Sequence, residues 1–478
     1  MSPTQKYYIL LLITTAAYFV ASKFLFDKIN DTIHTVIDEY FHIPQGLSFC
    51  KGNFSHWDPK ITTLPGLYLV SAFFGNLGCN TYNLRFVNLI ASCVNLLLFS
   101  SILKYVYFND RSHSKIILQA LNLALLPPLY FFSHVYYTDT LSLTFLLLFS
   151  RLCFTNRHKF YILLFGLCSV MMRQTNIVWV AMVFGHKFLD IFLRSSRVFG
   201  NQQITDLKLS KTSLIAKDVD SSKLKRYYSI VDMYYAVIYH VSTCLATFFR
   251  FVTFQDCAIL FTHLITLINF VVFIYLNGSV VIGDKTAHEV TIHTPQLLYF
   301  LLFYGVFGLP YVLSKFMSTI KLIFRNKILT VIIAITFVAM VHFNTEVHPY
   351  LLADNRHYTF YIQNRWYGKY DFARYATIPA YIFLLFSLYD NLRENNCISF
   401  LFPYTVSLIL VLGLQKLVEI RYFLIPYIVL RLRFGRPSQL VVVSEFILYI
   451  LLNSAAFYVF FNKEVFWKDF DYAQRIIW

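Results

Sequence analysis

Charge is scarce in this chain. Lysine, arginine, aspartate and glutamate make up only 14% of its 478 residues, whereas 57% are hydrophobic and 19% are aromatic. This composition excludes a chain of ordinary soluble domains and is typical of a protein whose solvent is largely lipid. The eight cysteines are scattered, and no Cys-x-x-Cys pair, His-Glu-x-x-His motif or glycine-rich phosphate loop occurs. The sequence therefore gives no indication of a zinc site or of a nucleotide cradle.

Long apolar runs are what the sequence has in abundance. A helix needs roughly 20 apolar residues to cross about 30 Å of hydrocarbon. The clearest runs are Tyr7 to Phe26, Phe86 to Val106, Ile116 to Phe132, Ile177 to Phe192, Ala258 to Leu276, Leu297 to Leu313, Ile328 to Val341, Tyr375 to Leu388, Ile398 to Leu414 and Leu440 to Phe461. Shorter runs are Leu141 to Phe154, Phe160 to Met172 and Tyr422 to Leu430. We predict an all-α polytopic membrane protein, a single integral membrane domain over residues 1–478 with about 12–14 spanning helices.

The distribution of the basic residues decides how the net charge of +16 is interpreted. They cluster in short stretches between apolar runs, and Arg431, Arg433 and Arg436 form one such stretch. This is the positive-inside pattern of a membrane protein, so a nucleic-acid partner is not expected. Counting from a cytosolic N-terminus places the polar insert over residues 194–250 in the cytosol. The same count places the loop over residues 27–83 on the lumenal side.

Adjacent carboxylates, Asp38 and Glu39, stand in this first lumenal loop among aromatic residues that favour amphipathic helices in the lipid interface. Carboxylates held at the membrane surface suit chemistry on a lipid headgroup, although acidic residues also serve as helix caps. Further candidates in the loop are His42, Trp57, Asp58 and Lys60.

Two features of the predicted lumenal loops relate to their compartment. Cys50 and Cys79 share the first loop, where a disulfide is allowed, but the sequence leaves their pairing open. The glycosylation sequons at Asn30, Asn53 and Asn277 all fall in lumenal stretches, which agrees with the topology without establishing it.

Two short turns between apolar runs carry single charges. Asp139 is interpreted as a helix cap, with a sugar-hydroxyl ligand as the alternative. Arg173 has no carboxylate near it in the sequence, and a cation at the membrane edge is a functional candidate.

A dense ionisable cluster follows in Gly283-Asp284-Lys285, with His288, Glu289 and His293 after it. The spacing does not place two imidazoles on one helical face, so we expect no metal here. Contact of Lys285 with a phosphate or a sugar is the preferred interpretation.

The segment from Asn344 to Tyr370 mixes ionisable and aromatic side chains, which suits a carbohydrate or headgroup site. Its candidate residues are His348, Asp354, Arg356 and His357. Glu419 and Arg421 open the short run at Tyr422. Two residues apart they would not share a helical face, so a simple ion pair is not expected and Arg421 is predicted to face an anionic ligand.

Several of these blocks carry a family resemblance. IDEYFHIPQ, WDPKITTLPGLY, RQTNIVW, VIGDKTAHE, HPYLLADNRHYTFYI and VEIRYFLIPY run in order from about Ile37 to Tyr427. They resemble the dolichyl-phosphate-glucose-dependent alpha-1,2-glucosyltransferases of the endoplasmic reticulum, which add the last glucose to the lipid-linked N-glycan precursor. The polar insert, Ile37 before the carboxylate pair and Ile420 within the Glu-x-Arg motif depart from the family pattern.

The resemblance implies a type C glycosyltransferase (GT-C) fold in the endoplasmic reticulum membrane with a lumenal active site. Its substrates would be dolichyl-phosphate-glucose and the diglucosylated lipid-linked oligosaccharide, with no cofactor or metal, and the protein would work as a monomer in contact with membrane lipid. One of Asp38 and Glu39, with Asp38 preferred, would be the base of an inverting displacement.

The resemblance also divides the other candidates between the two substrates. Donor phosphate and sugar contacts are expected from Arg356, Arg421, Lys285, His357, His348 and Asp354. Acceptor contacts are expected from His42, Trp57, Asp58, Lys60 and Glu419, and Asp58 and Lys60 have loop shaping as their alternative. A sister glycosyltransferase and a transporter or channel-associated protein are the competing functions. The transporter predicts ionisable groups at the membrane midplane and internal repeats, neither of which is evident in the sequence.

Overall fold

The computed structural model describes residues 3–75, 78–107, 112–155, 158–194, 252–285, 291–393, 396, 398–468 and 470–478. The predicted insert at 194–250 lies outside the described residues except for Arg194, as do His288 and Glu289.

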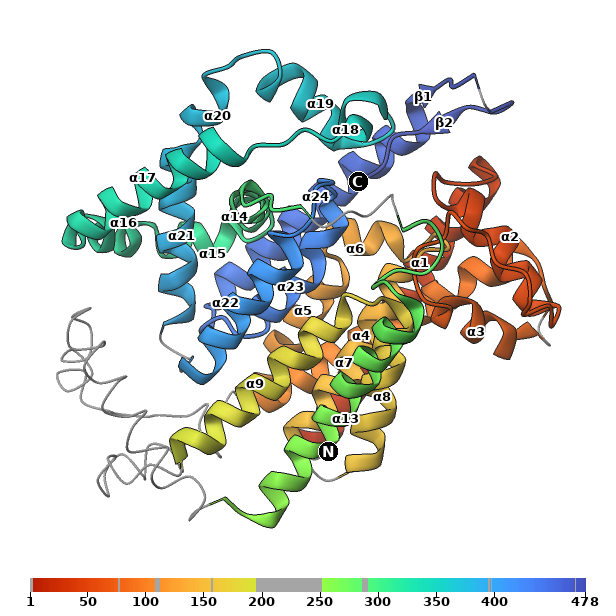
Figure 1. The fold of residues 1–478 in the computed structure, drawn as a ribbon, viewed down its shortest axis with the longest axis horizontal. Helices are drawn as coiled ribbons and strands as arrows, with labels where there is room; N and C mark the ends of the chain where they lie inside the picture. The colour runs from red at the N-terminus through yellow and green to blue at the C-terminus, as the bar shows by residue number, and fades with distance from the viewer. Residues whose placement is uncertain are drawn as a thin grey trace.

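Helices make up nearly all of the regular secondary structure of the described residues, as predicted for the fold class (Figure 1). The helices before the undescribed insert are α1 (Pro3–Thr32), α2 (Glu39–Cys50), α3 (Gly66–Phe73), α4 (Thr81–Val106), α5 (His113–Ala124), α6 (Pro127–Phe132), α7 (Thr138–Thr155), α8 (Lys159–Met172) and α9 (Asn176–Arg194). After it come α13 (Phe254–Asn277), α14 (Pro295–Phe307), α15 (Leu309–Ser314), α16 (Phe316–Arg325) and α17 (Lys327–Asn344).

Shorter elements alternate with longer helices in the last third of the chain. They are α18 (Pro349–Ala353), α19 (Tyr358–Ile362), the π-helical η3 (Gln363–Tyr367), α20 (Ala373–Ala376), α21 (Ile378–Leu392), α22 (Ile398–Leu412), the 3-10 helix η4 (Ile420–Phe423), α23 (Leu424–Arg431) and α24 (Gln439–Asn462). Two strands, β1 (Glu464–Val465) and β2 (Gln474–Arg475), form an antiparallel pair after α24.

Every predicted apolar run lies on one or more of these helices. Five described helices are long and apolar enough to cross a membrane, namely α1, α4, α13, α17 and α24. The protein is therefore a multi-pass membrane protein. Other runs are shorter or broken: the run from Ile116 divides before Pro127, and the run from Leu297 divides at Gly308. The number of crossings, about 12–14, stays a prediction.

Local signals fix several helix ends. The Asn80 side chain accepts a hydrogen bond from the Asn83 amide at 2.8 Å and so caps α4. Thr253 and Asp256 form a capping box at the start of α13. That helix ends at Gly278, whose φ of 69° lies in the left-handed region that glycine adopts without steric cost.

The bundle has two different ends. The short helices α2, α3, α18 and α19 and the β1–β2 pair gather toward one side of the molecule in Figure 1, whereas the N-terminus lies on the other. The predicted first lumenal loop contributes α2 and α3, and a disulfide joins Cys50 to Cys79 within it. The pairing that the sequence left open is therefore formed.

A buried ion pair between Arg431 and Glu445 corrects one expectation from the sequence. Arg431 is not a loop cation: its side chain is fully buried at the end of α23. Its Nε and Nη2 donate to the Glu445 carboxylate at 2.8 and 2.7 Å. Asn122 and Tyr311 donate to the same carboxylate at 2.8 and 3.2 Å. A cation inside the membrane requires such a partner, so this pair joins α5, α15, α23 and α24.

Candidate active site

Asp38 immediately precedes α2 and Glu39 is its first residue, but the two side chains have different partners. The Glu39 side chain has no exposed surface, and its oxygens accept bonds from Arg85 Nε at 2.8 Å and Arg85 Nη2 at 2.6 Å. The Val36 and Tyr136 amides donate to the same carboxylate at 2.8 and 2.6 Å. With both oxygens engaged, Glu39 acts as an anchor for the start of α2.

Arg85 was missed by the sequence analysis. It lies in the second turn of α4, and besides Glu39 it donates to the main-chain oxygen of His34 at 3.0 Å. The predicted span started at Phe86, which left Arg85 outside the membrane as a flanking residue. An arginine directly before an apolar run can belong to the same helix, where it needs a buried anionic partner. The position of Arg85 next to Phe86 was a sign of this in the sequence.

Asp38 keeps 35% of its side-chain surface exposed and contacts Arg421 Nη2 at 2.8 Å. Burial raises the pKa of this carboxyl, but Arg421, His42 and His357 together lower it below its ordinary value. Asp38 is therefore ionised at neutral pH and is the accessible member of the carboxylate pair.

Arg421 forms an ion pair with Glu419, which the sequence analysis did not expect. The expectation assumed a regular helix, whereas Glu419 has extended φ and ψ angles of −126° and 135° and precedes the 3-10 helix η4. An extended residue next to a tight turn brings positions two apart to the same side. Arg421 thus lies between Glu419 and Asp38.

The backbone before Asp38 is held in an unusual conformation. Ile37 has a φ of 40°, a value that costs a β-branched residue about 1–3 kcal/mol. Tyr137, in the turn between α6 and α7, spans this position: its hydroxyl accepts from the Asp38 amide at 2.9 Å and donates to the Val36 oxygen at 3.1 Å. The two bonds support the turn that sends Asp38 and Glu39 to separate partners.

His42 lies one turn along α2 from Asp38. Its Nδ1 lies 2.6 Å from the Tyr68 hydroxyl. Burial lowers the pKa of His42 although Asp38 opposes the effect, so the imidazole is neutral at neutral pH. Burial raises the pKa of Tyr68 well above its ordinary value, and the phenol keeps its proton.

Two turns that carried single charges in the sequence meet beside Arg421. Arg173, after α8, pairs with Asp139 in the first turn of α7, so its partner comes from another turn. The Arg173 guanidinium lies 5.9 Å from the Tyr422 ring. Burial lowers the pKa of Arg421, but Glu419, Asp38 and Asp139 raise it well above the ordinary value. Among the described residues, no group of three or more His, Cys, Asp and Glu is placed to hold a metal ion.

Arg356 and its neighbours form a second charged group. The Arg356 side chain is 9% exposed, pairs with Asp354 at 2.8 and 2.9 Å, and lies 4.0 Å from the Trp467 ring. His357 contributes to the low pKa of Asp38, which connects this group to the site. Arg356 thus contacts Asp354 and the segment after α24, whereas Arg421 contacts Asp38 directly.

The segment after α24 also contacts Thr35, in the loop after α1, and Tyr40, in the first turn of α2, which the sequence did not predict. The Tyr472 and Thr35 hydroxyls are hydrogen-bonded, and the Phe470 ring lies 5.6 Å from the Tyr40 ring. The Ile477 amide donates to the Arg356 oxygen at 2.8 Å. No pattern in this short, mixed segment signals such a contact.

The remaining candidates have partners other than Asp38. Asp58 accepts from the Lys60 amide at 2.9 Å, and Trp57 Nε1 donates to the Ile61 oxygen at 3.3 Å, so both shape the loop. Lys60 lies 5.1 Å from the Phe41 ring. Lys285 is exposed and donates to the Asn277 oxygen at 2.7 Å, and His348 lies half-buried just before α18.

Comparison with known proteins places the chain in a family context. The model of the DIE2/ALG10 family matches residues 32–432. A Drosophila melanogaster protein named Dol-P-Glc:Glc(2)Man(9)GlcNAc(2)-PP-Dol alpha-1,2-glucosyltransferase is 41% identical over 98% of this chain and 99% of its own length. Proteins of the same name from Homo sapiens and Arabidopsis thaliana are 34% and 29% identical over 96% and 92% of this chain, and 97% and 94% of their own lengths. No solved structure matches the chain.

Proposed function

The chain belongs to the DIE2/ALG10 family, and we propose that its Asp38 site transfers glucose from dolichyl-phosphate-glucose to the diglucosylated lipid-linked oligosaccharide. The acceptor atom is the 2-hydroxyl of the terminal glucose, and the product carries an alpha-1,2 linkage. The shared name of the relatives supports this activity and gives no support to a transporter or channel-associated protein.

The reaction is a single displacement. Asp38 takes the proton from the acceptor 2-hydroxyl while that oxygen forms a bond to the anomeric carbon of the beta-linked donor. The bond from the anomeric carbon to the phosphate oxygen breaks, and dolichyl phosphate leaves with the electron pair. Inversion needs one base and no covalent carboxylate, and a positioned base typically contributes about 10²–10⁴ in rate.

Arg421 binds the donor phosphate in this mechanism. It is held between Glu419 and Asp38, so an arriving phosphate competes with Asp38 for the guanidinium. Loss of that contact raises the pKa of Asp38, which makes the carboxylate a stronger base once the donor is bound. Charge that develops on the leaving phosphate then faces a preorganised cation.

The unequal burial of the two adjacent acids is the observation that carries the base assignment. Asp38 is 35% exposed and has one partner that a substrate can displace, whereas Glu39 has no exposed surface and four donors. A base must reach the proton that it removes.

The other expectations follow from the family and stay part of the proposal. The protein resides in the endoplasmic reticulum membrane with Asp38 on the lumenal side, in a GT-C fold. It works as a monomer and without a metal ion, since the leaving group needs cations that Arg421 supplies.

The test is transfer from dolichyl-phosphate-glucose to the diglucosylated acceptor by the purified full chain. Asp38→Asn is expected to lower kcat by about 10²–10⁴ with little change in donor affinity. Asp31→Asn, which removes an exposed carboxylate at the end of α1, shortly before Asp38, is the matched control and is expected to retain activity. Undiminished transfer by Asp38→Asn would refute the assignment, and loss of wild-type transfer in EDTA would refute the metal-free mechanism.

A further inference from the structure

The β1–β2 segment, residues 464–468 and 470–478, follows α24 and lies on the same side of the molecule as α2 and α18 (Figure 1). Its side chains are packed against their surroundings: Trp467, Phe470 and Tyr472 are half-buried, and Gln474 and Ile477 are each 1% exposed. The reaction proposed above uses none of these residues. The segment is therefore a fixed part of the structure near Asp38 to which no role has been assigned.

This segment contacts the chain on both sides of Asp38. Three residues before Asp38, the Thr35 hydroxyl is hydrogen-bonded to the Tyr472 hydroxyl. Two residues after it, the Tyr40 ring lies edge-on to the Phe470 ring at 5.6 Å between centroids. The rings of Phe470 and Tyr472 lie 5.7 Å from each other. One pair of neighbouring side chains thus bridges the turn that carries Asp38.

The far end of the β1–β2 segment is bound to the residues that open α19. The Ile477 amide donates to the Arg356 oxygen at 2.8 Å, and the Tyr358 amide donates to the Ile477 oxygen at 3.2 Å. His357 Nδ1 donates to the Trp478 main-chain oxygen at 3.2 Å. These bonds involve the backbone and do not depend on the Tyr472 hydroxyl. The segment is therefore anchored independently of its contact with the turn at Asp38.

The turn at Asp38 needs such support because its backbone is strained. Ile37 has a φ of 40°, and a residue in so sparsely populated a conformation keeps it only where its surroundings hold it there. The Tyr137 hydroxyl bonds to the residues on either side of Ile37. Tyr472 adds a contact one residue further out, at Thr35. Without it, the chain before Ile37 has one fixed point fewer, and the strained turn is freer to relax.

We propose that Tyr472 is a positioning residue for Asp38, and that the β1–β2 segment holds the base where it meets the acceptor hydroxyl. The proposal rests on the proposed function, which gives Asp38 its task. A base must lie within roughly 2.6–3.2 Å of the atom whose proton it takes. A misplacement of about 1 Å can lower a rate by about 10². Tyr472 acts through Thr35 and the backbone of the turn, so its effect falls on the chemical step and leaves substrate binding unchanged.

The experiment compares Tyr472→Phe and Thr35→Val in the purified full chain, because each substitution removes one hydroxyl and keeps the shape of the side chain. Each should lower kcat about tenfold, within the roughly 10²-fold that a 1 Å misplacement costs, with the KM of donor and acceptor as in the wild type. The double variant should lose no more than either single variant, since all three lack the same bond. Thr35→Ser keeps the hydroxyl and should retain the wild-type kcat.

Hydrogen exchange tests the positioning role without reference to glucosyl transfer. Exchange over residues 33–40 should rise in Tyr472→Phe, whereas exchange over residues 354–358 should stay as in the wild type, because the backbone bonds of Ile477 remain. Unchanged exchange over residues 33–40 would overturn the positioning role. Absence of transfer by the wild type would instead refute the proposed function, so the two failures are distinguishable.

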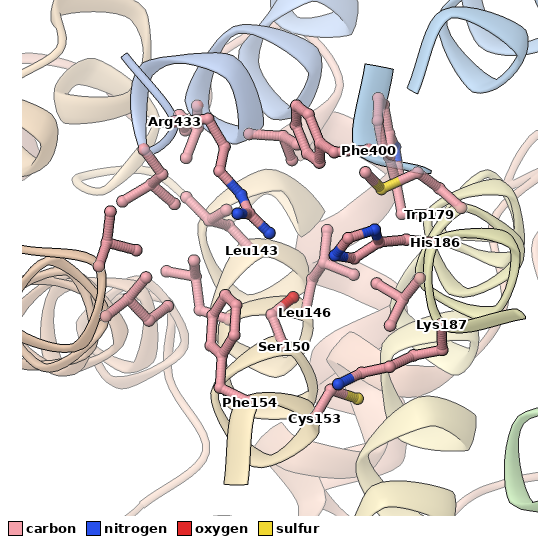
Figure 2. Close-up of a pocket in the computed structure, with 18 residues that line it drawn as sticks. Leu143, Leu146, Ser150, Cys153, Phe154, Trp179, His186, Lys187, Phe400 and Arg433 are labelled. Carbon is pink, nitrogen blue, oxygen red and sulfur yellow. The ribbon is translucent and has the colours of Figure 1, made fainter. Parts of the chain in front are cut away.

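Two controls remove a hydroxyl elsewhere. Tyr458→Phe changes an exposed tyrosine of α24, and Ser150→Ala changes the wall of the small cavity in Figure 2, which Trp179 and His186 also line, away from Asp38. Both should keep the wild-type kcat and exchange. A wild-type kcat in Tyr472→Phe would overturn the proposal. So would a rise in KM at unchanged kcat, or a double variant whose loss equals the product of the two single losses.

Discussion

Glu39 and Arg85 are buried together, and this predicts how each adjacent acid responds to loss of its charge. Glu39→Gln leaves the Arg85 guanidinium buried without its anion, so we expect the free energy of unfolding to fall by about 3–5 kcal/mol. Asp38→Asn should change stability far less, because Arg421 keeps Glu419 as its partner. Thermal unfolding of the two purified variants measures the difference, and equal losses would show that Glu39 is not an anchor.

The low pKa of Asp38 predicts the acid limb of the pH profile. Burial raises this pKa and Arg421 is the first of the groups that lower it, so wild-type kcat/KM should fall only below the ordinary Asp value of about 3.9. Arg421→Gln removes the cation and should move the limb to higher pH while lowering the rate by about 10²–10³. Arg421→Lys keeps the charge and should restore the limb toward wild type.

The control for this prediction is Arg365→Gln, which removes a cation in η3 that lies 5.2 Å from the Tyr361 ring. Its acid limb should coincide with that of the wild type. A limb that stays in place in Arg421→Gln would mean that another group titrates, and Asp38 would no longer be the base.

Site residues were predictable from the sequence where several ionisable side chains stand in one short segment. Their partners were not predictable where those partners come from distant segments that the fold brings together. Asp38 and Glu39 were identified as a pair, but their separation depends on Ile37 at a φ of 40° and on Tyr137 from a distant turn. Arg421 was predicted to face an anionic ligand, which stays a prediction, and its pair with Glu419 was not expected because it depends on extended backbone. Predictions from residue spacing assume a regular helix. Both differences, the separation of Asp38 from Glu39 and the pairing of Arg421 with Glu419, occur where the backbone is not helical.

The two predicted lumenal segments around Pro59 and Gly283 pack backbone to backbone. The Asp284 amide donates to the Pro59 oxygen at 2.7 Å, and a Cβ on Gly283 would lie 2.4 Å from that same oxygen. Gly283→Ala should therefore separate the segments and cost more than the roughly 1–2 kcal/mol that a left-handed conformation alone costs. Hydrogen exchange of the 278–285 peptide should rise, and the thermal midpoint should fall.

Gly52→Ala is the matched control for this substitution. Its φ of 82° resembles the 74° of Gly283, but nothing lies within 4 Å of the added Cβ. The control should show the conformational cost without the separation of segments. Equal effects of the two substitutions would contradict the close approach as the cause.

The helices were predictable because each apolar run is long. The positions at which a run divides into two helices depend on single proline and glycine residues. The apolar run from Ile116 to Phe132 divides where Pro127 and Pro128 begin α6, because a proline is tolerated in the first turn of a helix and not in its interior. The division between α14 and α15 at Gly308 was not foreseen, although Pro310 follows it. Contacts between elements, such as that of the segment after α24 with Tyr40, left no periodic signal in the sequence.

At the level of the whole molecule, helices in lipid associate without a strong hydrophobic driving force, so buried polar pairs can decide which helices meet. The Arg431–Glu445 pair joins α23 to α24 and receives further bonds from Asn122 on α5 and Tyr311 on α15. These partners come from positions up to 323 residues apart in the sequence. The clustering of Arg431 with other basic residues predicted a loop position. The sequence alone does not show that Glu445 lies beside Arg431.

This pair gives the last prediction. Arg431→Met or Glu445→Leu alone leaves one charge buried and unpaired, and each should lower the free energy of unfolding by about 3–5 kcal/mol. The double substitution removes both charges and should recover much of that loss, since a well-packed apolar pair can replace a buried ion pair. Arg436→Gln, which removes an exposed cation of the adjoining loop, should change the thermal midpoint little. A double variant whose loss equals the sum of the two single losses would show that the two residues act independently and that the pair does not hold these helices together.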